Sequence, residues 1–171
     1  MPRSADWVTP LKTLIFTVLV PGTVTVAVPR WLLRANPPPA STPAVWPWFG
    51  GVFMLCGVAI YLWCAWDFTF AGRGTPAPID APRNLVARGL YRYVRNPMYV
   101  GVLSILSGEA LWFWSQTLMR YAIVAFSFFY LFVVFYEEPI LRAKFGESYR
   151  QYCAAVPRWI PRWIPKMSAT R

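Results

Sequence analysis

Two clusters of polar residues lie at the ends of neighbouring apolar segments and have the side-chain types needed to bind a ligand. The first is Gly-Leu-Tyr-Arg-Tyr-Val-Arg-Asn-Pro-Met-Tyr-Val-Gly at positions 89–101. The second is the adjacent pair Glu137 and Glu138, followed by Phe-Gly-Glu-Ser-Tyr at positions 145–149. Charges beside hydrocarbon are costly, so two such clusters indicate a polar site at one membrane face. That site would suit chemistry on a lipid-like molecule.

The first cluster opens an apolar segment. Asn96 and Pro97 have the types preferred at the N-cap and the first position of a helix. Such an N-terminus carries partial positive charge and free N–H groups, so it can bind a carboxylate or phosphate. Tyr91, Tyr93 and Tyr99 offer rings that could stack on a base or face a cation. The alternative interpretation is a basic flank with an interfacial aromatic belt.

The second cluster is expected to close the fourth apolar segment, just before Pro139. Carboxylates at a helix C-terminus oppose the helix dipole, which is locally unfavourable. Adjacent helical side chains point about 100° apart, so one carboxylate can face a site while the other meets solvent or an arginine. The functional interpretation is a carboxylate for ammonium or hydroxyl groups. The alternative is an ion pair with Arg142 or with the basic loop.

Other reactive groups are few. The chain has no histidine, which removes Ser-His and Cys-His triads and any imidazole base or ligand. Its 3 cysteines have no metal-binding spacing, so no metal is expected. Glu109 and Asp67 are ionisable residues within or near apolar segments, which makes each a functional-site hypothesis. The alternative for each is a pair with an arginine.

Composition identifies the elements that must position these groups. Of 171 residues, 57% are hydrophobic and 14% charged, with a mean hydropathy of +0.38. The apolar residues fall in four segments close to the length that crosses ~30 Å of hydrocarbon, at 11–33, 46–70, 98–115 and 118–136. We expect one all-α domain over 1–171, a polytopic transmembrane helix bundle of about four spans. Pro21 and Pro29 predict a kink in the first segment, tolerated where neighbours satisfy the freed carbonyls.

Charge sets the expected topology. Of the 17 Lys and Arg residues, three fall on one face of a four-span arrangement: Arg30, Arg34 and Arg120. The others flank the termini and the loop from Ala71 to Asn96, which places both termini in the cytoplasm and both polar clusters on that face. The net charge of +10 therefore indicates anionic lipid headgroups rather than nucleic acid as a partner.

Four stretches together resemble the isoprenylcysteine carboxyl methyltransferase family and the wider phospholipid methyltransferase group. They are positions 89–101, Glu-Glu-Pro-Ile-Leu at 137–141, Phe-Gly-Glu-Ser-Tyr-Arg-Gln-Tyr at 145–152 and Val-Pro-Arg-Trp-Ile-Pro at 156–161. The resemblance implies a multi-pass membrane enzyme that binds S-adenosylmethionine at the cytosolic face, with cofactor-binding regions at 71–101 and 137–165. It also implies a lipophilic substrate that enters from the bilayer and a C-terminal amphipathic lid over 145–165.

Carried over by position, the resemblance implies a cofactor site of ten residues: Arg83, Asn84, Leu85, Val86, Tyr91, Asn96, Pro97, Met98, Tyr99 and Glu137. Glu138 and Arg95 are the catalytic candidates, and Glu109 and Arg158 are the substrate-binding candidates. Two positions depart from the family. Asn96 stands where the family usually has His, and Val133 stands where prenylcysteine enzymes place a substrate-binding Arg. The group that holds a substrate carboxylate is then either missing or supplied elsewhere, with Arg95 and Arg158 as candidates.

The implied reaction is methyl transfer to the carboxylate or thiol of an isoprenylcysteine-like molecule, or to a related hydrophobic O, S or N nucleophile. An anionic acceptor needs no base, whereas a protonated amine or a phenol does, with Glu138, Glu109 or Asp67 as candidates. One alternative is a phospholipid N-methyltransferase, and another is a non-catalytic anchoring or assembly protein, which cofactor binding would exclude. A small transporter using Glu109 is a third, disfavoured because the polar residues gather at one face.

Overall fold

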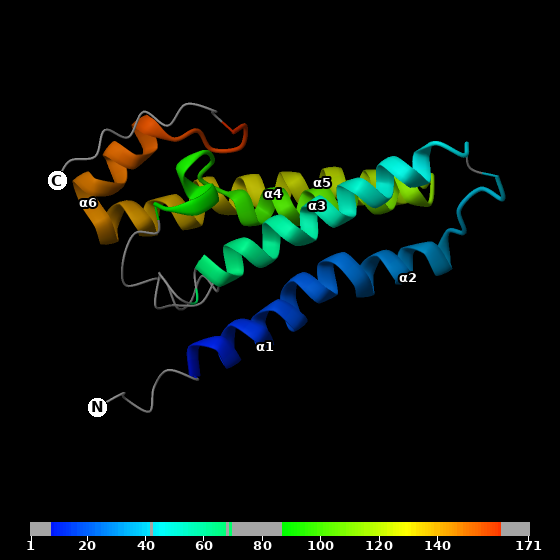
Figure 1. The fold of residues 1–171 in the computed structure, drawn as a ribbon, viewed down its shortest axis with the longest axis horizontal. Helices are drawn as coiled ribbons and strands as arrows, with labels where there is room; N and C mark the ends of the chain where they lie inside the picture. The colour runs from blue at the N-terminus through cyan, green and yellow to red at the C-terminus, as the bar shows by residue number, and fades with distance from the viewer. Residues whose placement is uncertain (1–7, 42, 68, 70–86, 162–171) are drawn as a thin grey trace.

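The computed structural model describes residues 8–41, 43–67, 69 and 87–161, and within these ranges it contains helices but no strand. Long helices lie side by side along one direction (Figure 1). In chain order they are α1 (Val8–Gly22), the π-helical turn η1 (Thr23–Ala27), α2 (Val28–Ala35), α3 (Trp46–Asp67), the 3₁₀ turn η3 (Gly89–Arg92), α4 (Pro97–Trp112), α5 (Gln116–Phe132), the π-helical turn η4 (Val133–Glu137) and α6 (Glu138–Ala155).

Three helical stretches are long and apolar enough to cross a membrane: Thr13–Ala35, Trp46–Asp67 and Gln116–Ala155. They confirm the predicted all-α membrane bundle. The expected third span is shorter than predicted, since α4 has 16 residues, a rise of about 24 Å at 1.5 Å per residue. It ends at Trp112 because Ser115 serves as the N-cap of α5, where its hydroxyl accepts from the Leu118 N–H at 3.3 Å.

The closest helix pair is α3 with α4. A Cβ on Gly50 would lie 2.6 Å from the carbonyl oxygen of Gly108, and one on Gly57 would lie 2.6 Å from that of Gly101. Both helices therefore meet backbone to backbone at two points, the packing that small residues allow between membrane helices. Gly101, the last residue of the first polar cluster, serves this contact. The result is a closely packed pair of helices, and the first polar cluster lies at one end of it.

The π-helical turn η1 accommodates Pro29. In η1 the Val28 N–H bonds to the Thr23 carbonyl, and Pro29 follows. Pro29 cannot donate to the Val24 carbonyl, and the Tyr121 hydroxyl of α5 donates to that oxygen instead, at 3.0 Å. A neighbouring helix thus satisfies a carbonyl that proline leaves free, as the sequence predicts for the first segment.

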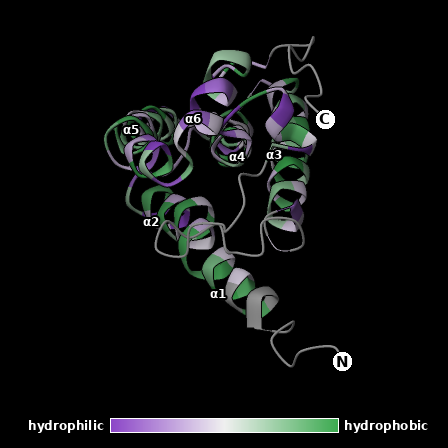
Figure 2. Ribbon diagram, turned by 90° about the vertical axis from the view of Figure 1, so that its left-hand side faces the viewer, coloured by the Kyte–Doolittle hydropathy of each residue, from purple (hydrophilic) through white to green (hydrophobic). Residues whose placement is uncertain are grey.

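The predicted end of the fourth segment at Glu137 and Glu138 is wrong. The Glu138 N–H bonds to the Val133 carbonyl, and the chain continues through this π-turn into α6. The helix can continue because Pro139 lies in the first turn of α6, where a missing N–H is tolerated. The direction then changes at Gly146, which has φ +51°. Hydrophilic colouring gathers on α6 and on the turn beside α3, whereas α1 is mostly hydrophobic (Figure 2).

Candidate functional site

A cavity of about 450 Å³ lies between α1, α4 and α5, a size typical of small-molecule sites. Much of its wall is apolar and comes from α1 and α5, with members Phe16, Val20, Phe128, Phe129 and Phe132. The first polar cluster and η4 supply the polar part of the wall, with Tyr91, Arg95, Asn96, Tyr99 and Glu137. The two sequence clusters therefore meet at one cavity.

Tyr99 and Glu137 form the polar contact at the centre of this wall. The Tyr99 hydroxyl donates to Oε2 of Glu137 at 3.1 Å, across 38 positions of sequence. Tyr99 is held in place by the Phe129 ring, with centroids 5.0 Å apart. Glu137 is the last residue of a π-turn, a local widening that re-aims side chains and recurs at functional sites. The pair places one carboxylate in the wall of a mostly apolar cavity.

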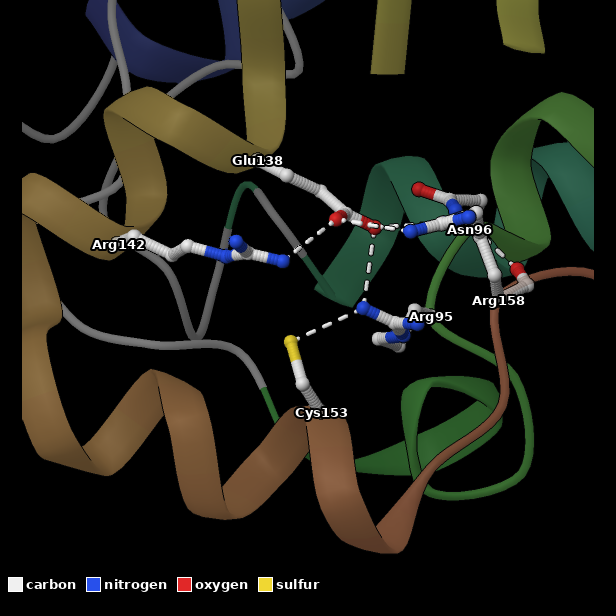
Figure 3. Close-up of polar contacts among 6 residues, drawn as sticks. All are labelled: Arg95, Asn96, Glu138, Arg142, Cys153 and Arg158. Carbon is white, nitrogen blue, oxygen red and sulfur yellow. Dashed lines mark hydrogen bonds and ion pairs between the residues drawn. The ribbon is translucent and has the colours of Figure 1, made fainter. Parts of the chain in front are cut away.

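Glu138 faces a different environment, in which three arginines surround its carboxylate (Figure 3). Arg95 lies 3.0 Å away and Arg142 3.3 Å, while Arg158 makes contacts of 2.7 and 3.0 Å. The Glu138 side chain is only 4% exposed, and it does not line the cavity. The two adjacent carboxylates thus separate as their helical spacing predicts, one toward the cavity and the other toward arginines.

Asn96 is the N-cap residue and Pro97 the first residue of α4, as predicted, but the predicted capping hydrogen bond of the Asn96 side chain is absent. The Asn96 side chain makes no capping bond, and its Nδ2 donates to the Arg158 carbonyl at 3.1 Å (Figure 3). Beside it, the Arg95 backbone N–H donates to the Pro157 carbonyl at 2.9 Å. The Asn96 side chain therefore bonds to the Arg158 carbonyl of the segment after α6, and not to the free N–H groups of α4.

The segment after α6 also contacts aromatic side chains of α4 and α5. The Trp159 ring lies 5.5 Å from Phe126, 6.3 Å from Tyr130 and 6.4 Å from Tyr99, measured between centroids. A hydrogen bond to Glu138 raises the pKa of Arg158, which keeps this residue charged at the cluster. Residues 156–161 thus pack beside Tyr99. The rest of the expected lid, to 165, lies outside the described residues.

Tyr91 is buried in the turn η3 and packs on Cys64 of α3. The Tyr152 hydroxyl of α6 donates to its carbonyl oxygen at 2.8 Å. Burial raises the pKa of Tyr91 well above its ordinary value, so the phenol stays neutral. Met98 also lines the cavity, whereas Tyr93 does not.

Some predicted residues are not brought to the cavity. Glu109 lies twelve positions beyond Pro97, about 18 Å along α4, and it does not line the cavity. Arg158 meets Glu138 instead. The predicted positions 83–86 (Arg83, Asn84, Leu85 and Val86) lie outside the described residues. The sequence analysis missed the walls from α1 and α5, because an apolar residue in a span gives no signal that separates cavity from lipid.

Comparison with known proteins returns one family. The family model described as phospholipid methyltransferase matches residues 45–148, which is more than half of the chain and covers α3, α4, α5, η4 and part of α6. Neither the comparison with curated proteins nor that with solved structures finds a match. The matched region contains the Tyr99–Glu137 pair and the glycine contacts of α3 and α4.

Proposed function

Since the chain belongs to the phospholipid methyltransferase family, which indicates membrane methyltransferase activity, we propose that it transfers a methyl group from S-adenosylmethionine to a lipophilic acceptor. The observation that carries this proposal is the Tyr99–Glu137 pair, a half-buried carboxylate and phenol in the wall of a mostly apolar cavity. Such a cavity with a few convergent polar groups is the usual form of a small-molecule site.

The residues of the cavity fit the proposed cofactor. Glu137 can accept hydrogen bonds from an ammonium group or from ribose hydroxyls. Because the Asn96 side chain is directed to Arg158, no side chain caps α4, and its first N–H groups are left for a carboxylate. Tyr91 and Tyr99 offer rings to the adenine or the sulfonium. Met98, Pro97 and positions 83–86 complete the proposed set.

The cofactor supplies an electrophilic methyl group, so the protein has mainly to align the acceptor and exclude water. The apolar walls from α1 and α5 suit both tasks, and they suit the tail of a lipophilic acceptor. Arg95 lines the cavity, and its buried Nε has no hydrogen-bond partner in the described structure. We propose that Arg95 binds the anionic end of the acceptor. This favours a carboxylate or thiolate, such as that of an isoprenylcysteine-like molecule, which needs no base.

Glu138 is not placed to act as a catalytic base. Its two carboxylate oxygens accept from three guanidinium groups, and it is not among the residues that line the cavity. Its proposed role is to hold Arg95 toward the cavity and Arg158 beside it.

Phospholipid N-methylation is the second candidate, and the family match favours it. A protonated amine must lose a proton before it attacks. Among the described residues that line the cavity, Glu137 is the carboxylate in reach of such an amine. In this case Glu137 would take the proton from the acceptor amine, in addition to any contact with the cofactor.

The proposal extends to the whole chain. We propose that residues 1–171 act as one domain with both termini in the cytoplasm, beside anionic headgroups, and the Lys and Arg distribution supports this orientation. The contacts of Trp159 with Tyr99 and of Arg158 with Glu138 support the proposed lid over 145–165, which would cover the cofactor.

Labelled methyl transfer tests the proposal. Detergent-purified protein is incubated with methyl-labelled S-adenosylmethionine and, in separate reactions, with an S-farnesylcysteine derivative, a long-chain thiol and phosphatidylethanolamine. Label in a base-labile ester or a thioether supports the main proposal, and label in phosphatidylethanolamine supports the second candidate. If a folded protein binds no cofactor and labels none of the three, an anchoring or assembly role replaces both.

A further inference from the structure

Asp67, the last residue of α3, is a buried carboxylate with unusual surroundings. Its side chain is 5% exposed, and both Nε and Nη2 of Arg88 lie 3.0 Å from its Oδ1. Its Oδ2 is buried and has no hydrogen-bond partner in the described structure. A carboxylate at a helix C-terminus opposes the dipole, and burial of an incompletely paired charge costs further stability. Local stability therefore does not explain why the residue is an aspartate.

The residue beside the unpaired Oδ2 of Asp67 is a glycine, Gly89. Gly89 has φ +56°, a conformation that residues with a side chain rarely adopt, and a Cβ there would overlap Oδ2 of Asp67. The same Cβ would lie 3.1 Å from Nε1 of Trp63. The start of η3 therefore packs closely against the end of α3. Arg88 bonds to Oδ1 of Asp67, and Gly89 leaves room for Oδ2.

The turn held in this way leads to the cavity. Cys64 lies three positions before Asp67, on nearly the same face of α3, and it is 0% exposed beneath Tyr91. Tyr91, within the turn, and Arg95, which follows it, both line the cavity. The last turn of α3 thus forms a platform on which the first polar cluster is seated.

We propose that Asp67 is a positioning residue, which with Arg88 and Gly89 fixes η3 on α3 so that Tyr91 and Arg95 face the cavity. Its effect on cofactor binding rests on the proposed function, whereas the packing of η3 against α3, called here the seating of the turn, does not. The two parts are tested by separate measurements.

The seating is tested by alkylation with N-ethylmaleimide, followed by mass spectrometry that resolves each cysteine. Cys64 is buried against the turn, and its alkylation rate in the same protein unfolded in sodium dodecyl sulfate serves as the reference. We expect Asp67→Asn and Gly89→Ala each to raise the alkylation rate of folded-state Cys64 at least 10-fold relative to that reference. Gly146→Ala is the matched control, since Gly146 has φ +51° but nothing within 4 Å of a Cβ. Protection of Cys64 that persists in both variants overturns the proposal.

Positioning is tested by calorimetric binding of S-adenosylmethionine to the same proteins. Asp67→Asn and Arg88→Gln should each raise Kd at least 5-fold. Arg88→Lys should retain most of the wild-type affinity. The double variant Asp67→Asn/Arg88→Gln should bind no more weakly than either single variant, because the two residues act as a unit. Faster Cys64 alkylation with an unchanged Kd limits Asp67 to a structural role and overturns the proposal. If the wild type binds no cofactor, the proposed function fails, and the alkylation result still decides the seating of η3.

Discussion

The hydroxyl of Tyr99 donates to Oε2 of Glu137 across 3.1 Å, which joins the first turn of α4 to a π-turn in the long helix Gln116–Ala155. The contact brings together the two polar clusters of the sequence at one cavity. The next residue, Glu138, turns to three arginines, including Arg158 of the segment after α6. Two adjacent carboxylates therefore have separate tasks, one at the cavity and one in holding the surrounding segments together.

Tyr99→Phe tests the hydrogen bond without disturbing the aromatic packing. The ring keeps its contacts with Phe129 and Trp159, while the carboxylate of Glu137 loses its donor. A hydrogen bond to a charged group is worth about 1.5–3 kcal/mol, part of which the cofactor can replace. We expect the Kd for S-adenosylmethionine to rise about 5- to 20-fold, measured by calorimetry. An unchanged Kd would remove Tyr99 from the cofactor site.

Glu138→Gln should lower stability more than any other single loss of charge among the described acidic residues. The substitution leaves Arg95, 12% exposed, without its carboxylate. Removal of one partner of a buried ion pair costs about 3–5 kcal/mol. We expect the thermal midpoint of the detergent-purified protein to fall by about 5 °C or more.

Two variants control for this effect. Glu147→Gln breaks an exposed pair with Arg150 at 3.6 Å, and Arg142→Gln removes the more exposed arginine of the cluster. Both should shift the midpoint little, since exposed pairs contribute about 0–1 kcal/mol. If Glu138→Gln abolishes methyl transfer while the midpoint and cofactor binding stay at wild-type values, Glu138 is catalytic and the structural role assigned to it is wrong.

Gly57→Ala should weaken the contact between α3 and α4. Its Cβ would meet the Gly101 backbone at 2.6 Å, so the helices must separate. Forced expansion of a packed contact costs about 1–3 kcal/mol, and we expect a lower thermal midpoint. The comparison is Gly22→Ala, whose Cβ would approach nothing closer than Thr17 O of the same helix, at 3.7 Å. Equal midpoints for the two variants would contradict the backbone contact.

Much of the fold could be predicted because membrane spans depend on composition and length, which the sequence displays directly. The apolar segments, the helix start at Pro97 and the divergence of Glu137 from Glu138 all follow from local rules of helix geometry. That the Val24 carbonyl has a hydrogen-bond donor could be predicted, because a carbonyl left free by proline inside a membrane helix must be satisfied by a neighbour. That this donor is Tyr121 could not be predicted.

The remaining features depend on partners that are distant in the chain. Asn96 has the type of a helix cap, yet its side chain bonds to a carbonyl 62 positions away. The π-turn before Pro139 lets the helix continue where the proline and the two carboxylates predicted an end. Phe128 and Phe129 line a cavity, but in the sequence they match residues that face lipid. Periodicity and propensity carry no information on such long-range choices.

Calorimetric binding of S-adenosylmethionine to the detergent-purified protein, with Glu137→Gln and the control Glu147→Gln, tests the central claim most directly. Glutamine keeps an oxygen for Tyr99 but removes the charge that the cofactor's ammonium or ribose groups would meet. The account predicts micromolar binding by the wild type and by Glu147→Gln, with a Kd about 10- to 100-fold higher for Glu137→Gln. Equal affinity of all three proteins, or no binding by folded wild type, would contradict it.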